Sequence, residues 1–211
     1  ARLVAAASEK ITKLKEVITP HVHEKHMLVY CGATTMRDVD YKEEHPPVDD
    51  VRQIDIVADL LGNELDMKVS KFTSEENTEE REIIKKEFAD GKHLQALIAI
   101  RCLDEGVNIP SIKTAYILAS STNPKEYIQR RGRVLRTYPG KNFATIYDFI
   151  TLPSYPDEII NSVRSLAIRE LVRMRDFASI SENPSAVDIL VTDIIHAYNI
   201  TINEERGDQN V

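Results

Sequence analysis

Short apolar runs and amphipathic stretches alternate along the chain, and the two patterns predict strands and helices in turn. Apolar runs at 27–31, 95–101, 114–119 and 143–150, with an alternating segment at 67–73, predict strands. Helical spacing predicts helices over 3–18, 51–61, 74–90, 123–136, 157–180 and 185–200. Strands that are apolar throughout are typical of sheets covered on both faces. This order of elements predicts an α/β domain with a mostly parallel sheet of about five or six strands.

Glycines mark where two of these helices should end. Gly62 is expected to stop the second predicted helix, and Gly91 the third. In the third helix, Ile83, Ile84 and Phe88 are expected to face inward.

The pattern changes again after the last predicted strand, where only helical spacing continues. We therefore expect three parts: a linker helix over 1–20, an α/β domain over 21–152 and a helical extension over 153–211.

Composition excludes several classes of protein. The chain has 42% hydrophobic and 29% charged residues, as water-soluble folded domains do. No apolar run approaches the roughly 20 residues that span a bilayer, and the N-terminus has no signal-peptide pattern. Cys31 and Cys102 fit reduced thiols, and the cluster of His21, His23 and His26 falls in a connector without zinc spacing. We expect a cytoplasmic protein with no membrane span and no metal site of its own.

Positive charge is concentrated in one stretch of an otherwise acidic chain. Residues 125–141 carry a local charge of +5, whereas the net charge is −7, so the remainder carries −12. This asymmetry favours a focused phosphate site over a broad surface that coats nucleic acid.

The basic stretch should open with a helix. Asn123 suits an N-cap, Pro124 suits the first turn, and Glu126 completes a capping-box pattern. An apolar stripe of Ile128 and Leu135 is expected to dock this helix on the core.

Three polar side chains of this helix should share one face. Gln129, Arg133 and Arg136 are spaced by four and three residues, and guanidinium groups fork onto phosphate oxygens. Gly132 lowers helix propensity by roughly 1 kcal/mol, which indicates close approach there by a ligand or another backbone.

At this helix the chain resembles superfamily 2 helicases and translocases of the DEAD/DEAH type. The spacing Gln-x-x-Gly-Arg-x-x-Arg over 129–136 is similar to motif VI of that family. The resemblance implies a RecA-like P-loop NTPase fold and identifies this domain as the second of two motor domains. It implies that Arg136 is an arginine finger, that Arg133 contacts the γ-phosphate, and that Gln129 lies by the phosphates or the attacking water.

Residues 102–110 resemble motif V, in the form found in the UvrB-like and restriction-enzyme branch of the superfamily. This implies ATP contacts from Gly106, through its main chain, and from Glu105 beside it. Asn108 takes the place of the aspartate that usually contacts the ribose. Gly132 joins this ATP-binding set.

The resemblance also implies nucleic-acid contacts. Thr34 and Thr35 follow the strand that resembles motif IV, and Arg81 and Arg101 occupy positions near the path of the strand. An ordinary strand-end turn explains the two threonines equally well, and Arg81 has an alternative partner in Asn77.

Two motifs that a nucleotide motor needs are absent from these 211 residues: a Gly-x-x-x-x-Gly-Lys-Ser/Thr loop and an acidic pair for magnesium. We therefore expect ATP and Mg²⁺ to be bound mainly by an N-terminal RecA-like domain of the same full-length protein. This chain alone should be inactive.

The function implied is the C-terminal motor domain of an ATP-dependent DNA helicase or translocase, serving restriction or repair. DNA is favoured over RNA because of the motif V resemblance. The alternative, from another class, is a helicase-like module that binds nucleic acid or protein without turnover; the intact set of Gln129, Arg133 and Arg136 favours the motor.

Overall fold

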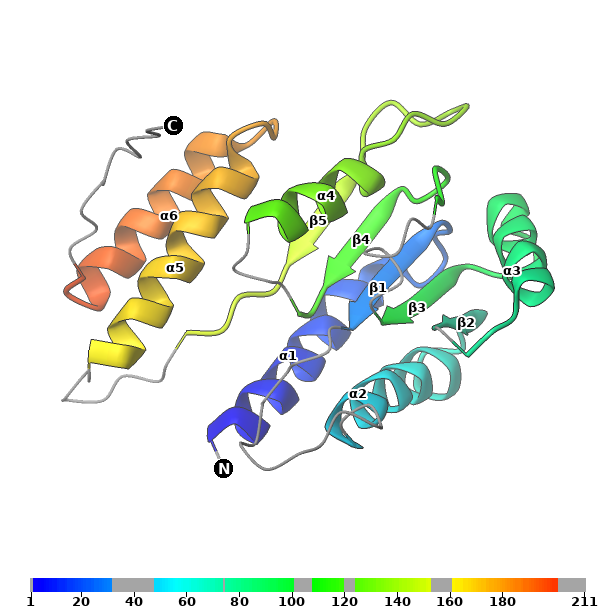
Figure 1. The fold of residues 1–211 in the computed structure, drawn as a ribbon, viewed down its shortest axis with the longest axis horizontal. Helices are drawn as coiled ribbons and strands as arrows, with labels where there is room; N and C mark the ends of the chain where they lie inside the picture. The colour runs from blue at the N-terminus through cyan, green and yellow to red at the C-terminus, as the bar shows by residue number, and fades with distance from the viewer. Residues whose placement is uncertain are drawn as a thin grey trace, which may run out of the picture. The chain divides into compact units, whose positions relative to one another are not determined.

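The computed structural model describes residues 2–31, 48–73, 75–100, 108–119, 124–152 and 161–200. Internal contacts divide the chain into two units, Ala1–Ile150 and Thr151–Val211 (Figure 1). The first unit holds the sheet and most of the helices, and the second holds a pair of helices.

The first unit is built on a sheet of five parallel strands in the order β2-β3-β1-β4-β5. The strands are β1 (Met27–Cys31), β2 (Val69–Phe72), β3 (Ala96–Ile100), β4 (Thr114–Ile117) and β5 (Thr145–Asp148). The three central strands are almost wholly buried, as their apolar sequences require. The predicted α/β class is confirmed, and the outer strands are shorter than their sequence patterns indicate.

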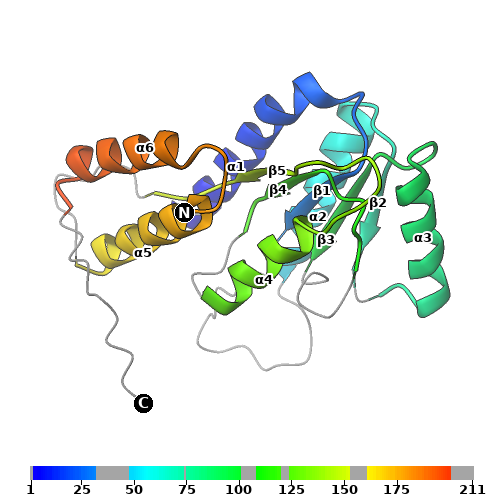
Figure 2. The ribbon, with the colours of Figure 1, turned by 90° about the horizontal axis from the view of Figure 1, so that it is seen from above.

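Helices cover both faces of this sheet (Figure 2). The helical elements of the unit are α1 (Arg2–Ile18), η1 (Thr19–His21), α2 (Val48–Asp59), η2 (Leu60–Glu64), α3 (Thr78–Asp90) and α4 (Pro124–Val134). Helices α1 and α2 lie on one face and α4 lies on the other (Figures 1 and 2). Strand side chains alternate between the two faces, so each helical layer contacts its own set of strand residues.

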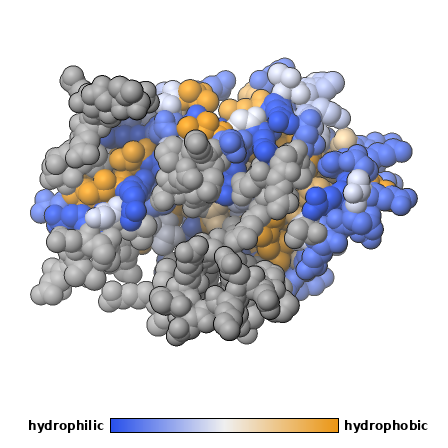
Figure 3. Space-filling model, in the orientation of Figure 1, coloured by the Kyte–Doolittle hydropathy of each residue, from blue (hydrophilic) through white to orange (hydrophobic). Residues whose placement is uncertain are grey.

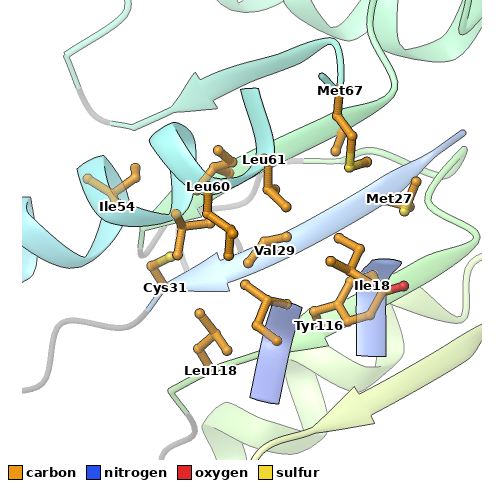
Figure 4. Close-up of a cluster of buried hydrophobic side chains, with 14 residues drawn as sticks. Ile18, Met27, Val29, Cys31, Ile54, Leu60, Leu61, Met67, Tyr116 and Leu118 are labelled. Carbon is orange, nitrogen blue, oxygen red and sulfur yellow. The ribbon is translucent and has the colours of Figure 1, made fainter. Parts of the chain in front are cut away.

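The main core lies between the sheet and the layer of α1 and α2 (Figure 4). Leu14 and Ile18 of α1 and Ile54 and Val57 of α2 contribute to it and are at most 3% exposed. Val29 at the centre of β1 belongs to the same cluster. Helix α1 is thus packed on the sheet through the stripe that its apolar spacing indicates.

The end of α2 differs from the prediction. Gly62 does not stop the helix, because the chain continues through η2, a π-helical turn that ends at Glu64. The amide of Leu65 donates to the carbonyl of Leu60 at 3.1 Å, a bond that spans five residues. This wider turn keeps Leu60 and Leu61 in the core, at 3% and 0% exposure.

Helix α3 is shorter than predicted and buries fewer side chains. It begins at Thr78 after Asn77, whose side chain accepts from the Glu80 amide in a capping box. Gly91 ends it as predicted, with a left-handed φ of 66°. Phe88 is fully buried, but the prediction for Ile83 is wrong, since that side chain is 56% exposed.

The second unit is a helical hairpin of α5 (Asn161–Ala178) and α6 (Pro184–Ala197). Its small core contains Ala167, Leu171, Val191 and Ile200. Arg173 is 1% exposed and donates to Glu170 at 2.7 Å within α5.

The described surface seen in Figure 3 is mainly hydrophilic, with smaller hydrophobic areas between the hydrophilic ones. Among the residues that the structure describes, no helix is both long and apolar enough to cross a bilayer.

Candidate nucleotide-binding site

Three central strands end at the same edge of the sheet. Cys31 of β1 pairs with Ile100 of β3, and Tyr30 pairs with Ile117 of β4. The segments predicted to carry the site follow these three strands in the sequence. The carboxyl edge of a parallel sheet is where α/β proteins commonly bind ligands.

The inner face of α4 is formed by residues other than those predicted. Tyr127, Arg130 and Val134 are 5%, 7% and 0% exposed, at helical spacings of three and four residues. The expected docking stripe of Ile128 and Leu135 is wrong, because these side chains are 45% and 42% exposed. The buried face of α4 is therefore rotated about the helix axis by roughly one residue position from the predicted face.

Arg130 is buried because it has an aromatic partner. Its guanidinium carbon lies 4.6 Å from the ring centroid of Tyr30, which is fully buried on β1. A guanidinium over an aromatic face is attracted by the ring quadrupole, and its stem adds apolar contact. This contact fixes α4 on the sheet face opposite α1 and α2. The helical spacing of Tyr127, Arg130 and Val134 is the sequence signal that could have predicted this buried face.

The outer side of α4 carries the predicted phosphate-binding face. Gln129 and Arg136 are exposed and Arg133 is half-buried. Gly132 is exposed on the same side, and among the described residues nothing lies within 4 Å of a Cβ built on it. The predicted docking stripe is wrong. Gln129 and Arg133 lie one helical turn apart in α4, whereas Arg136 follows the end of the helix at Val134, so the face predicted for the three residues stays a prediction.

Asn108 starts the next described segment and is exposed. The residues after it are firmly packed: Ile109 is 4%, Ser111 is 2% and Ile112 is 0% exposed. We call the packed residues 109–112 the anchor; Asn108 is the exposed polar residue directly before it.

Lys141 links this anchor to the end of α4. Its Nζ donates to the carbonyl oxygens of Pro110 at 3.2 Å, Val134 at 2.6 Å and Arg136 at 2.9 Å. Partial burial, and to a smaller degree the nearby charge of Lys113, lower the pKa of Lys141. The lysine was not identified as a site residue from the sequence, because its partners are main-chain atoms that leave no sequence pattern.

Arg81 has a structural environment at the start of α3. Its Nη2 donates to the carbonyl of Thr73 at 2.6 Å, and its guanidinium carbon is 5.7 Å from the centroid of Phe72. The side chain of Asn77 instead accepts from the amide of Glu80 at 3.0 Å. The contact with Thr73 was not expected, and the role of Arg81 toward nucleic acid stays a prediction.

The remaining predicted contacts, Thr34, Thr35, Arg101, Glu105 and Gly106, lie outside the described residues, as does Cys102.

Cys31 is buried, and two of the three clustered histidines have hydrogen-bond partners. Burial raises the pKa of the Cys31 thiol well above its ordinary value. His21 lies 2.8 Å from a carboxylate oxygen of Glu24, and His26 lies 3.2 Å from the carbonyl of Ala89. Within the described part of the chain, no cluster of His, Cys, Asp and Glu side chains could hold a metal ion.

Comparisons with known proteins identify the family of this chain. Residues 9–138 match the model of the "Helicase conserved C-terminal domain" family. The chain is 33% identical over 130 residues to the DNA 3'-5' translocase XPB2 of Sulfurisphaera tokodaii. It is also 33% identical over 100 residues to putative helicase 22 of a Sulfolobus islandicus filamentous virus. These matches cover 62% and 47% of this chain but only 24% and 16% of the two relatives.

Solved structures share the fold. The yeast DEAD-box splicing factor Prp28 superposes with a TM-score of 0.58 at 19% identity, covering 97% of this chain and 37% of that one. The C-terminal part of the Fun30 ATPase domain gives a TM-score of 0.53 at 20% identity, covering 90% and 54%. Both are too distant to show more than the fold. The chain therefore belongs to the helicase conserved C-terminal domain family, and its parallel sheet with flanking helices has the RecA-like fold.

Proposed function

We propose that this chain is the second motor domain of an ATP-dependent DNA translocase or helicase, and that Arg136 is its arginine finger. The observation that carries the proposal is the division of α4 into two sides. Tyr127, Arg130 and Val134 anchor the helix, whereas Gln129 and Arg136 are exposed. Gln129 on this anchored helix and Arg136 just after it are exposed polar side chains that a ligand can reach.

The donor set fits a nucleoside triphosphate. The guanidinium groups of Arg133 and Arg136 can each present paired N–H donors to phosphate oxygens, and Asn108 can hydrogen-bond a ribose hydroxyl. The open space beside Gly132 leaves room for a phosphate or a second backbone to approach the helix. ATP supplies the scissile phosphoanhydride, and we propose that a preceding RecA-like domain holds most of it together with Mg²⁺.

The mechanism we propose is electrostatic. Negative charge grows on the transferred phosphoryl group, and fixed cations stabilise it most when they need not reorganise. Arg136 would contact this charge only when the two motor domains close on ATP. Hydrolysis would release the contact and let the domains open, shifting the grip on the DNA.

DNA is proposed as the track because the relative XPB2 is described as a DNA translocase, at 33% identity. The resemblance of residues 102–110 to the restriction and repair branch points the same way. Without a closing partner domain the arginines have no nucleotide to contact, so this chain alone would not turn over ATP.

The test is Arg136→Ala in the full-length protein, with ATPase measured in the presence of duplex DNA and of duplex RNA. Loss of an arginine finger is expected to lower kcat by about 10³-fold or more. The wild type should be stimulated more by DNA than by RNA. Because Arg136 is exposed, the melting temperature should be unchanged.

The matched control is Arg131→Ala, which removes the same charge from α4, five residues before Arg136. At 3.6 residues per turn, Arg131 lies on the far side of α4 from Gln129, so the ATPase rate should stay within about twofold of wild type. Near-normal turnover in Arg136→Ala would contradict the arginine-finger assignment. Equal DNA affinity with and without ATP would instead favour a module that binds without turnover.

A further inference from the structure

We infer that Lys141 is a positioning residue for Arg136, because its ammonium group ties the main chain of that arginine to the anchor that follows Asn108. The inference rests on the proposed function, since it assumes that Arg136 acts on ATP.

Arg136 needs such support because it lies beyond the regular helix. Helix α4 ends at Val134, and the amide of Leu135 donates to the carbonyl of Arg131 at 3.0 Å as a last helical bond. The main chain of Arg136 has no regular secondary structure. An arginine two residues past a helix end would move with a fraying terminus unless another group held it.

A tight turn brings Lys141 back to this terminus. Pro139 and Gly140 occupy its two central positions, and Gly140 has a left-handed φ of 74°. The amide of Lys141 donates to the carbonyl of Tyr138 at 3.0 Å and closes the turn. Proline followed by a glycine of positive φ is the signature of a type II turn.

The ammonium group of Lys141 then meets three carbonyl oxygens, from Val134, Arg136 and Pro110. Two of these lie at the helix terminus, where carbonyl groups lack intrahelical partners and a positive charge is favourable. A lysine ammonium carries three N–H donors, so its capacity is matched by the three acceptors.

The third acceptor, the carbonyl of Pro110, connects Lys141 to the packed residues beside Asn108. Pro110 follows Ile109, which is 4% exposed, and precedes the buried Ser111 and Ile112. Lys141 therefore ties the main chain of Arg136, which lies outside regular secondary structure, to the packed residues that directly follow Asn108. The finger and the ribose-contacting residue would reach the nucleotide at a fixed separation.

The test uses Lys141→Met in the full-length protein, with kcat, the KM for ATP and the melting temperature measured together. A finger displaced by about an ångström is expected to lower kcat roughly 10- to 100-fold. The KM for ATP should change less than about twofold, because ground-state binding is assigned mainly to the other domain.

Two further variants separate geometry from charge. Lys113→Met removes a neighbouring positive charge without touching the three carbonyl contacts, so it should keep kcat within about twofold of wild type. Lys141→Arg keeps the charge, but a planar guanidinium cannot direct three N–H donors from one nitrogen to three separate carbonyl oxygens; it should restore only part of the lost kcat.

The outcomes distinguish this inference from the proposed function. If Arg136→Ala is inactive while Lys141→Met keeps kcat within about twofold, the positioning role is wrong and the finger assignment stands. If Lys141→Met lowers the melting temperature but not kcat per folded molecule, the lysine is merely structural and the inference is overturned. If Lys113→Met lowers kcat as much as Lys141→Met, a general field effect replaces it. Normal turnover in Arg136→Ala overturns both.

Discussion

Helices α3 and α4 belong to the same unit. An arginine that the sequence marks for function lies in α3 and another lies two residues after α4, but the ends of the two helices are fixed in different ways. In α3 both ends are set by neighbours in the chain. Asn77 and Glu80 exchange two hydrogen bonds at 2.9 and 3.0 Å, and Gly91 closes the other end in a left-handed conformation. The end of α4 is held instead by Lys141, which also reaches Pro110.

Arg81 and Arg136 also differ in which of their groups the structure holds. Arg81 at the start of α3 donates to the carbonyl of Thr73 and lies near the ring of Phe72. Arg136 lies exposed beyond α4, with only its main-chain carbonyl engaged by Lys141 among the contacts the structure describes. The guanidinium of Arg81 thus contributes a hydrogen bond to the fold, whereas the contact described for Arg136 involves only its main-chain carbonyl.

The largest stability difference should separate buried from exposed apolar residues of the two helices. Phe88→Ala in α3 should cost about 3–5 kcal/mol of unfolding free energy, because the ring is fully buried. Leu135→Ala after α4 should cost about 0.5 kcal/mol or less, because that side chain is 42% exposed. Urea unfolding of the 211-residue chain measures both. Equal costs would mean that α4 docks through the stripe its sequence first indicated.

A smaller effect should distinguish the arginines. Arg81→Ala should lower the free energy of unfolding by about 1.5–3 kcal/mol, because the Thr73 carbonyl loses a charged donor. In the full-length protein, kcat per folded molecule should stay near wild type, the reverse of the pattern for Arg136→Ala. A fall in DNA affinity with unchanged stability would instead assign Arg81 to the nucleic-acid path.

The smallest effects should have opposite signs at two glycines. Gly91→Ala should destabilise the fold by about 1 kcal/mol, because φ is 66° and the new Cβ would lie 3.1 Å from Lys25. Gly132→Ala should stabilise the isolated chain by up to about 1 kcal/mol, since α4 gains a better helix former with open space around it. Thermal unfolding of both variants tests this contrast. Destabilisation by Gly132→Ala would show that the described backbone already needs the glycine.

Most of the fold could be predicted because the signals are local. The apolar runs of β1, β3 and β4 and the helical spacing of α1 specify elements that need no knowledge of their partners. The errors arose where packing decides: Ile83 was expected inside, and Gly62 was expected to end α2. In both cases the sequence pattern indicates a helix but does not indicate which of its residues other elements cover.

The candidate site was predictable only in part, for the same reason. The spacing of Gln129, Arg133 and Arg136 predicts a shared polar face, but the helix ends at Val134, and helical spacing therefore does not extend to Arg136. The burial of Arg130 depends on Tyr30, a residue on a strand far away in the sequence. Lys141 contacts main-chain carbonyls, which every residue possesses. The residue types at these positions therefore do not predict the contacts.

The position of β5 has a practical consequence for anyone who trims this domain. The family match ends at residue 138, whereas β5 runs from Thr145 to Asp148 and is hydrogen-bonded to β4. A truncation at the family boundary would strip the outer strand from the sheet and expose the unpaired amide and carbonyl groups of β4. Because every residue of β4 is buried, the newly exposed edge strand would promote aggregation by pairing with other chains. The boundary of the family match is therefore a poor guide to where the folded domain ends.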